Sequence, residues 1–279
     1  MSVDTTSRVF SEYLTHEAIL KYTRSTAGYG VSYLLDHEYK AVYLWALDHL
    51  PQNLKRDGLR IMEFGCGGGM NLIQLISVLN QNSVRVERAI GTDFSSVLID
   101  AANREARSYL QEQQRHQIEF HIAKHETLLD DLSVASGVSK QQVQNSQHFI
   151  VGVNTIRYSH HAGTELQTVQ NLFDLLVPGG LCVIIDMNNG YPFFKSELKN
   201  KVRTQKRDEC YLPSLEEYVS PFRELGFEVL RNEHFCWVPH SSGPLMCYTF
   251  SWLSPILNLV ARSRAMRSLV VARKPETRA

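Results

Sequence analysis

Two stretches of the sequence combine residue types at spacings that could do chemistry. The first, LRIMEFGCGGG over residues 59–69, places Glu63 ahead of glycines at positions 65, 67 and 69. Glycine lets a backbone pass close beneath a ligand, where a Cβ would clash. The second stretch, RYSHH, carries His160 and His161, and a histidine titrates near neutral pH and can accept a proton. The first stretch therefore indicates a ligand cradle, and the second contains candidate bases.

The elements around the glycines indicate how they are held. An apolar run over residues 59–64 predicts a buried strand, and apolar residues then recur at helical spacing over residues 70–79. A strand, a glycine turn and a helix begin a nucleotide-binding α/β unit, in which the helix N-terminus offers N–H groups to an anion. The dehydrogenase pattern G-x-G-x-x-G/A fails at Met70, and no lysine follows the glycines as a P-loop requires.

A second acid and a later turn complete the pattern. The run RAIGTDF ends the next predicted strand in Asp93, and LLVPGG precedes a predicted fifth strand over residues 181–187. Together with E-x-G-x-G-x-G, these motifs resemble the class I methyltransferases that use S-adenosylmethionine, over about residues 59–275. The resemblance implies an α/β fold. It is a Rossmann-like seven-stranded sheet of order 3-2-1-4-5-7-6, with the last strand antiparallel, helices on both faces and an N-terminal helical cap.

The resemblance also divides the chain into two parts. Residues 1–50 are expected to form the helical cap, and residues 51–279 the methyltransferase domain. Within that domain, residues 240–267 are expected to be an insertion with its own helix, and the polar stretch 189–213 is expected to cover the pocket entrance.

The resemblance implies roles for individual residues at a cofactor site. The Asp93 carboxylate can accept both ribose hydroxyls, Phe94 is placed to pack on the adenine, and Arg24 could hold the methionine carboxylate. The family usually has an aspartate near the end of the third strand. This chain has Ala123 and Lys124 there, and their backbone groups could substitute. The expected contacts of S-adenosylmethionine are Arg24, Glu63, Gly65, Cys66, Gly67, Gly69, Asp93, Phe94, Ala123, Lys124 and Asn154.

Methyl transfer requires that the acceptor is positioned and, where needed, deprotonated. His160 is the first candidate for the base and His161 the second, with Tyr22 from the cap as a hydrogen-bond partner. Either histidine could instead cap the next helix or line the pocket, and positioning alone suffices if the acceptor is already nucleophilic. No metal is expected, because a magnesium site of the catechol type built on Asp186 needs an acid where this chain has Asn154.

Three function classes remain open. The favoured one is a methyltransferase for a small apolar or aromatic acceptor, such as a natural product, including prenylated or terpenoid compounds. A quinone precursor or another lipid methylated on carbon is the alternative. Six tyrosines between positions 13 and 43 support this class, because aromatic faces suit a sulfonium cation and a flat acceptor.

The second class is a protein or nucleic-acid methyltransferase. The balance of 29 basic and 29 acidic residues argues against a general nucleic-acid partner. The third class is a non-catalytic binding module or an NAD-dependent enzyme. Titration with S-adenosylhomocysteine and with NAD separates it from the first two.

The remaining expectations concern the surroundings of the protein. Five scattered cysteines and the lack of a secretory segment favour a cytoplasmic location. No run of about 18 apolar residues is present, so no membrane span is expected. Residues 240–267 combine an apolar stretch with arginines, which is also typical of an interfacial helix. Peripheral membrane contact therefore stays open, ranked below packing against the cap, and a homo-oligomer could form through the cap.

Overall fold

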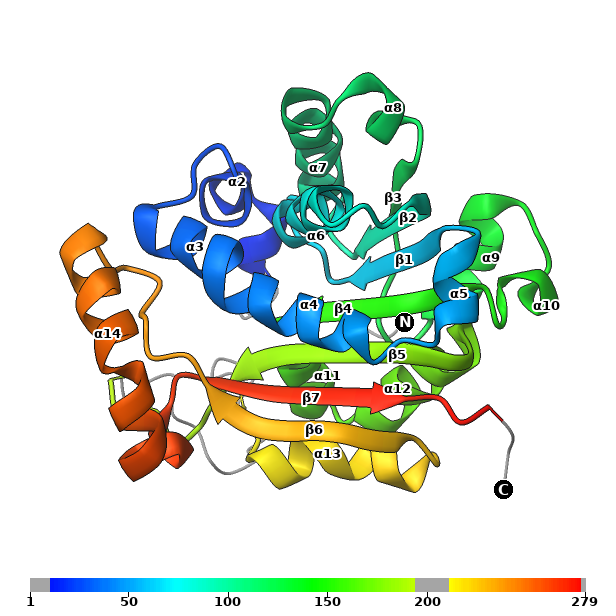
Figure 1. Ribbon diagram of the computed structural model, residues 1–279. Coiled ribbons are helices and arrows are strands. Elements are labelled where there is room, and N and C mark those ends of the chain that lie inside the picture. The colour runs from blue at the N-terminus through cyan, green and yellow to red at the C-terminus, as the bar shows by residue number, and fades with distance from the viewer. Residues whose placement is uncertain (1–10, 194–210, 277–279) are drawn as a thin grey trace, which may run out of the picture.

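A seven-stranded sheet forms the centre of the molecule (Figure 1). The computed structural model describes residues 11–193 and 211–276. The strands are β1 (Leu59–Phe64), β2 (Val86–Asp93), β3 (Ile118–Ile122), β4 (Gln147–Val153), β5 (Leu176–Met187), β6 (Glu228–Phe235) and β7 (Arg267–Arg273). Their order is β3-β2-β1-β4-β5-β7-β6, and β7 runs antiparallel to both of its neighbours while the other pairs are parallel. The sheet expected from the sequence is confirmed.

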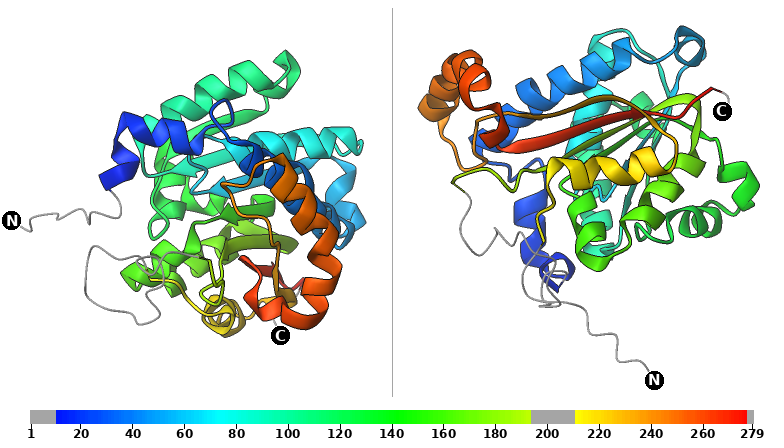
Figure 2. Two further views of the ribbon diagram at one scale, coloured as in Figure 1. Left: turned by 90° about the vertical axis from the view of Figure 1, so that its left-hand side faces the viewer. Right: turned by 90° about the horizontal axis from the view of Figure 1, so that it is seen from below.

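Helices precede the sheet in the chain and cover both of its faces (Figures 1 and 2). Before β1 come η1 (Glu12–Leu14), α2 (His16–Tyr22), α3 (Tyr29–Tyr33), the π-helical turn η2 (Leu34–Tyr39), α4 (Lys40–Asp48) and α5 (Gln52–Arg56). The later helices are α6 (Met70–Gln81), α7 (Ser96–Tyr109), α8 (Glu112–Arg115), α9 (Leu128–Ser136), α10 (Lys140–Val143), α11 (Ile156–Ala162), α12 (Glu165–Leu175), α13 (Leu215–Glu224), α14 (Pro244–Ala261) and η4 (Arg262–Arg264).

The core lies on the two faces of the sheet and follows the alternation of the strands. Successive side chains of a strand point to opposite faces. Ile61 and Phe149 accordingly belong to the cluster under α4 and α6, whereas Met62 and Ile150 belong to the cluster under α9, α12 and α13. All four side chains are completely or almost completely buried. This two-sided burial explains why the central strands read as near-continuous apolar runs.

Some local elements differ from the expectations. The chain between β2 and β3 contains two helices, α7 and α8, and the polar residues before β1 include the short helix α5. The stretch after β4, for which no helix was predicted, is the seven-residue helix α11. Helices this short hold too few turns for apolar periodicity to identify them.

The N-terminal segments have two different positions. α4 packs in the core against the sheet, with Tyr43 and Ala46 fully buried. η1 and α2 lie instead over α7, where Tyr13 and Ala18 contact Leu98. The division of the chain at residue 50 remains a prediction, and residues 194–210 of the expected pocket cover lie outside the described residues.

The insertion forms α14, which lies at the edge of the molecule beside α3 (Figures 1 and 2). α14 contacts α3 of the expected cap, in line with the preferred expectation, but Cys247 is the only buried residue of the helix and most of its side chains are exposed. Within the described parts of the chain, Pro244–Arg264 is also the one helix long and apolar enough to cross a membrane. The expectation that no such segment exists is corrected by this finding.

Candidate active site

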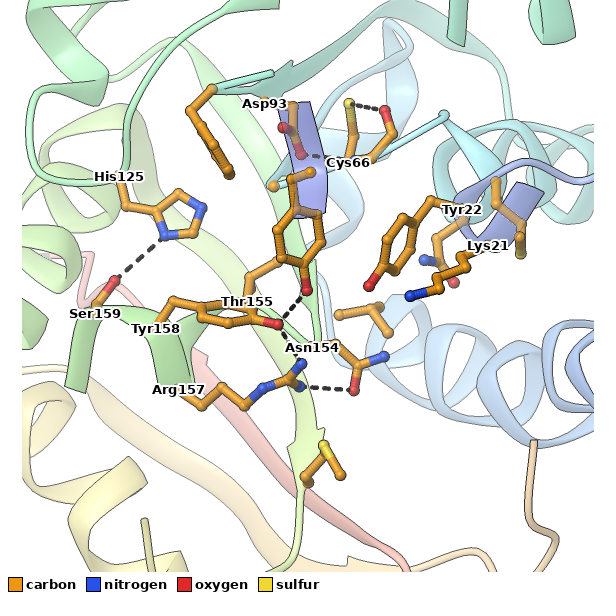
Figure 3. Close-up of a pocket in the computed structure, with 18 of the residues that line it drawn as sticks. Lys21, Tyr22, Cys66, Asp93, His125, Asn154, Thr155, Arg157, Tyr158 and Ser159 are labelled. Carbon is orange, nitrogen blue, oxygen red and sulfur yellow. Dashed lines mark hydrogen bonds between the residues drawn. The ribbon is translucent and has the colours of Figure 1, made fainter. Parts of the chain in front are cut away.

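A cavity of about 1110 Å³ opens at the carboxyl ends of β1, β2 and β4 (Figure 3). Ligands of open α/β sheets bind at this edge, where the strand order reverses, and here β2 and β4 flank β1 on opposite sides. Figure 3 shows Asp93 and Cys66 at one end of the cavity and Asn154 and Arg157 at the other. Ligand pockets commonly measure roughly 300–1,000 Å³, so this cavity has room for two small molecules.

The turn between β1 and α6 needs glycine for its conformation and for its surroundings. Three of its glycines have left-handed φ angles, +62° at Gly65, +53° at Gly67 and +80° at Gly69. A Cβ at Gly65 would overlap the Cγ2 atom of Thr155, and one at Gly68 would lie 2.5 Å from the carbonyl oxygen of Tyr22. The Gly68 amide donates to that same oxygen over 3.1 Å. The end of α2 is therefore held against the glycine turn.

Asp93 closes β2 and faces the cavity with a carboxyl group that is largely buried. Its Oδ2 atom accepts a hydrogen bond from the Gly67 amide and its Oδ1 atom one from the Ser95 amide, both over 2.9 Å. Burial raises the pKa of this carboxyl group to about 6, although the two amides act to lower it. A carboxylate offers about four acceptor positions, so two remain for the hydroxyls of a ligand.

The expected cofactor set divides into residues at the cavity wall and residues behind it. Ala123 and Lys124 are both tied by their amides, which donate to the Asp93 carbonyl (3.0 Å) and to Asp131 Oδ2 (2.9 Å). Their carbonyl oxygens are the backbone groups by which they could contact an adenine. The expected residues that line the cavity are Gly65, Cys66, Gly67, Asp93, Phe94, Lys124 and Asn154, with Gly69 and Ala123 adjoining them.

Arg24 and Glu63 lie away from the cavity wall. The Arg24 guanidinium donates to Gln74 and lies 3.9 Å from Asp36. Glu63 is completely buried at the end of β1, and this burial raises the pKa of its carboxyl group well above the ordinary range. Lys21 lines the cavity, and Figure 3 shows its ammonium group beside Tyr22. Its Nζ atom donates to Glu12 Oε2 over 3.3 Å, and it is the basic residue of α2 that lines the cavity.

His125 lines the cavity although the sequence analysis assigned it no role. Burial lowers the pKa of its imidazole to about 4, so the ring is neutral at neutral pH. Ser159 Oγ accepts a hydrogen bond from Thr168 over 3.0 Å and can donate its own hydrogen to His125 Nδ1 over 3.3 Å. This pairing leaves the hydrogen of the neutral ring on Nε2. His125 directly follows Lys124, just after the carboxyl end of β3. That position in the sequence could have identified it as a residue of the site.

Aromatic rings from η1 and α2 form one wall of the cavity. The rings of Tyr13 and Tyr22 are stacked, with centroids 5.0 Å apart, and Tyr13 meets Phe94 edge-on at 5.9 Å. The Tyr22 hydroxyl donates to Glu12 over 3.1 Å. Burial raises the pKa of both phenols well above their ordinary value, so both remain protonated.

Hydrogen bonds link the polar groups at the other end of the cavity (Figure 3). Arg157 donates to the Tyr158 hydroxyl over 2.7 Å and forms an ion pair with Asp186 at 3.1 Å. The Tyr158 hydroxyl is hydrogen-bonded to that of Tyr13. These residues come from η1, α11 and the end of β5, and their separation in sequence explains why no role was predicted for Tyr13, Arg157 and Tyr158.

Asn154 follows β4 with a left-handed φ of +58°. Its Oδ1 atom accepts hydrogen bonds from Arg157, over 3.2 Å, and from Arg267. Arg267 is completely buried and also contacts His240, which lines the cavity. Asn154 therefore joins the guanidinium group of Arg157, which lines the cavity, to that of the buried Arg267.

The two candidate bases on α11 point in different directions. His161 lines the cavity, and its Nδ1 atom accepts a hydrogen bond from the Tyr211 amide over 3.3 Å. His160 is buried behind the wall. Its ring meets that of Tyr218 edge-on, with centroids 5.5 Å apart, and its Nδ1 atom lies 3.9 Å from Glu165. Of the two, only His161 faces the space where an acceptor could bind.

Asp186, which was considered for a magnesium site, and the nearby Asn188 have other partners. Asp186 is buried against Arg157, and Asn188 donates to the carbonyl oxygens of Ser263 (2.9 Å) and Ala265 (2.7 Å). In the part of the chain that the structure describes, no group of three or more His, Cys, Asp or Glu side chains is arranged to hold a metal ion.

A family model described as a methyltransferase domain matches residues 55–225 of the chain. The chain belongs to this methyltransferase family. It is an S-adenosylmethionine-dependent methyltransferase, as the glycine turn and Asp93 indicated. The matched region begins in α5 and ends just after α13, so it contains both ends of the cavity.

The methyltransferase is 28% identical, over 150 residues, to the citrinin polyketide synthase of Monascus ruber. The match covers 53% of this chain but only 5% of the relative, so the chain corresponds to a small part of that protein's length. An equal match exists to the citrinin polyketide synthase of Monascus purpureus.

Solved structures share the fold at low identity. The CMeT domain of the citrinin polyketide synthase superposes with a TM-score of 0.54 at 18% identity, over 93% of this chain and 56% of that one. The CurJ carbon methyltransferase gives 0.56 at 18%, over 92% and 57%. The geranyl diphosphate C-methyltransferase of Streptomyces coelicolor gives 0.52 at 14%, over 84% and 77%. At these identities the similarity establishes the fold.

Proposed function

We propose that this methyltransferase moves the methyl group of S-adenosylmethionine to a small apolar or aromatic acceptor bound in the same cavity. The observation that carries the proposal is the cavity itself. Its lining combines a glycine turn and a buried carboxylate with apolar and phenolic side chains. Its volume of about 1110 Å³ accommodates cofactor and acceptor side by side.

The glycine turn fits the cofactor because a Cβ would fill the cradle or clash with its walls. Asp93 would accept the ribose hydroxyls, Phe94 would pack on the adenine, and Cys66, Gly67 and Asn154 would contact the bound molecule. Lys21 reaches the cavity where Arg24 does not, so the methionine carboxylate is assigned to Lys21. When bound, the cofactor supplies an activated methyl group on a positive sulfur, which suits the adjacent faces of Tyr13 and Tyr22.

Several apolar side chains support a hydrophobic acceptor. The cavity is also lined by Val31, Leu34, Leu35, Met70, Val153 and Met187. The proteins to which this chain is similar include a polyketide synthase and a geranyl diphosphate C-methyltransferase. We therefore place a natural product, including prenylated or terpenoid compounds, ahead of a quinone precursor or another lipid.

The affinity for S-adenosylhomocysteine is expected to depend on pH around 6. Burial raises the pKa of Asp93 to about 6, and a protonated carboxyl group loses both its charge and an acceptor position. If only the ionised form binds, the affinity falls about tenfold for each pH unit below 6 and is constant above about pH 7. Calorimetric titrations from pH 5 to pH 8 measure this profile. A matching profile in the Asp93→Asn variant would assign the titration to another group.

His161→Ala is expected to lower turnover by about 10²–10⁴-fold if His161 removes a proton from the acceptor. His160→Ala is the matched control, because that ring is buried behind the wall and contacts no ligand space. It should keep turnover in the fraction of protein that remains folded. Both variants should bind S-adenosylhomocysteine normally. Turnover preserved in both would leave positioning, with Tyr22 and Tyr158 as hydrogen-bonding groups, as the mechanism.

The function itself is tested by titrating the purified protein with S-adenosylhomocysteine and with NAD. We expect binding of the first and none of the second, and tight binding of NAD alone would contradict the proposal. Incubation with methyl-labelled cofactor and fractionated metabolite extracts then identifies the acceptor. Label in an apolar small molecule supports the proposed acceptor class, whereas label in protein or nucleic acid points to the second function class.

A further inference from the structure

Helix α14 presents apolar side chains to solvent as well as to the protein. Its inner face includes Cys247 and Phe250, which pack on the core. Its outer face is formed by Leu245, Met246, Tyr248, Trp252, Ile256, Leu259 and Val260. Of these, Leu245 is 81% exposed, Trp252 72% and Leu259 86%. A surface helix normally turns polar residues outward, and a contiguous exposed apolar patch marks a contact surface.

The charged residues within the segment that contains this helix are all basic. From Pro239 to Arg267 the sequence contains no Asp or Glu, and the helix itself carries no charged residue. Arg262 and Arg264 follow it directly and are exposed. Arg262 donates to Glu233 over 2.7 Å but keeps about half of its side chain accessible. Exposed Trp and Tyr rings are also typical of the boundary between lipid and water.

We propose that the outer face of α14 binds the surface of a lipid bilayer that carries anionic headgroups. The apolar side chains would enter the boundary between headgroups and acyl chains, and Arg262 and Arg264 would face the negative lipids. This surface is additional to the active site, and its occupant is the membrane itself.

The structure favours a helix that lies on the membrane over one that crosses it. A crossing places the two helix ends on opposite sides of a hydrocarbon core about 30 Å thick. Here both ends are held by the same domain. Before the helix, His240 and Ser242 lie against Gly30, and after it Asn188 binds the carbonyl oxygens of Ser263 and Ala265. β6 and β7, which lead into and out of the segment, are paired with each other in one sheet.

The proposed membrane surface adjoins the cavity. His240 lines the cavity a few residues before α14 begins, and α14 packs beside α3, from which Val31 also reaches the cavity. In Figures 1 and 2, α14 lies on the side of the sheet where the parallel strands have their carboxyl ends. A bilayer at α14 would bring apolar acceptors to the rim of the active site; this last step rests on the proposed function.

The test is sedimentation of the protein with vesicles of phosphatidylcholine alone and of phosphatidylcholine with one quarter phosphatidylglycerol. We expect co-sedimentation with the anionic vesicles and a blue shift of tryptophan fluorescence that is lost in Trp252→Phe. Ile256→Glu/Leu259→Glu should lower the partition at least tenfold. Arg264→Gln should lower it about fivefold on the anionic vesicles, since one basic residue contributes about 1 kcal/mol there.

The matched control is Val134→Glu, which places the same charge at an apolar side chain that is 83% exposed on α9, in another part of the surface. It should sediment like the unchanged protein. All of these sites are exposed, so thermal unfolding should stay unchanged. Failure of the unchanged protein to bind anionic vesicles overturns the proposal. The proposal is also overturned if light scattering shows a dimer in the absence of lipid and Ile256→Glu/Leu259→Glu dissociates that dimer. A second copy of the chain, and not a membrane, would then cover the outer face of α14.

S-adenosylhomocysteine affinity, measured on each variant without lipid, separates this proposal from the proposed function. Vesicle binding without cofactor binding would contradict only the proposed methyltransferase site. Cofactor binding without vesicle binding would contradict only the proposed membrane-binding surface.

Discussion

Replacing Asp93 by asparagine is expected to weaken the binding of S-adenosylhomocysteine by about 10- to 150-fold. Hydrogen bonds to a charged group contribute about 1.5–3 kcal/mol, and each 1.4 kcal/mol is a factor of ten in affinity. The amide retains one acceptor oxygen, but its NH₂ group would meet the Gly67 or Ser95 amide, which now donates to the carboxylate over 2.9 Å. The glycine turn would lose a partner at the same time as the ribose.

Calorimetry at pH 8, where Asp93 is ionised, measures this loss. Asp100→Asn is the matched control, because it makes the same change at an exposed position of α7. It should leave the affinity within about twofold of the unchanged protein, a range typical of surface substitutions. If Asp93→Asn binds S-adenosylhomocysteine as tightly as this control, Asp93 has only a structural role at the end of β2. The ribose would then bind elsewhere.

Gly65→Ala is expected to lower the free energy of unfolding by about 2–5 kcal/mol and to abolish cofactor binding. Two costs add at this position. An L residue in the left-handed region costs about 1–2 kcal/mol, and forcing a methyl group into a packed site typically costs 1–3 kcal/mol. The φ of Gly65 is +62°, and its Cβ would overlap Thr155 Cγ2 and come 3.0 Å from His125 Nε2.

Gly226→Ala separates the two costs. Gly226 also has a left-handed φ, +82°, but nothing lies within 4 Å of the position its Cβ would take. This control should therefore lose only the backbone part, about 1–2 kcal/mol, in a denaturant titration followed by circular dichroism. In Gly65→Ala, the further change Thr155→Ser removes Cγ2 and should restore part of the stability. Without such coupling between positions 65 and 155, the clash would not be the cause.

The glycine turn, Asp93 and the sheet could be predicted from the sequence because each depends on local patterns. A left-handed turn needs glycine, and a two-sided parallel sheet needs apolar strands. Asp93 was placed by its position at the end of β2 alone. The short helix α11 was missed, and with it the different directions in which His160 and His161 point. Neighbouring side chains on a helix differ by about 100° in direction, and only the packing of α11 decides which of them faces the cavity.

Other site residues depended on contacts that no local pattern contains. Arg24 lies near the glycine turn in space, but Asp36 and Gln74 hold its guanidinium away from the cavity. Tyr13 reaches the site only because η1 folds back over α7 to meet Tyr158. The exposure of α14 could not be predicted either, because an apolar sequence gives the same pattern whether it is covered by protein or by lipid.

Asn154 has a consequence for attempts to change the acceptor by directed evolution. The residue must adopt a φ of +58° and offer an acceptor to two guanidinium groups. Glycine meets only the first demand, glutamine only the second, and branched or aromatic residues meet neither. A library randomised at this position would consist mostly of damaged proteins, however well the new side chain suited the substrate. The apolar wall at Val31, Leu35 and Met187 carries no such double demand, and diversity is better placed there.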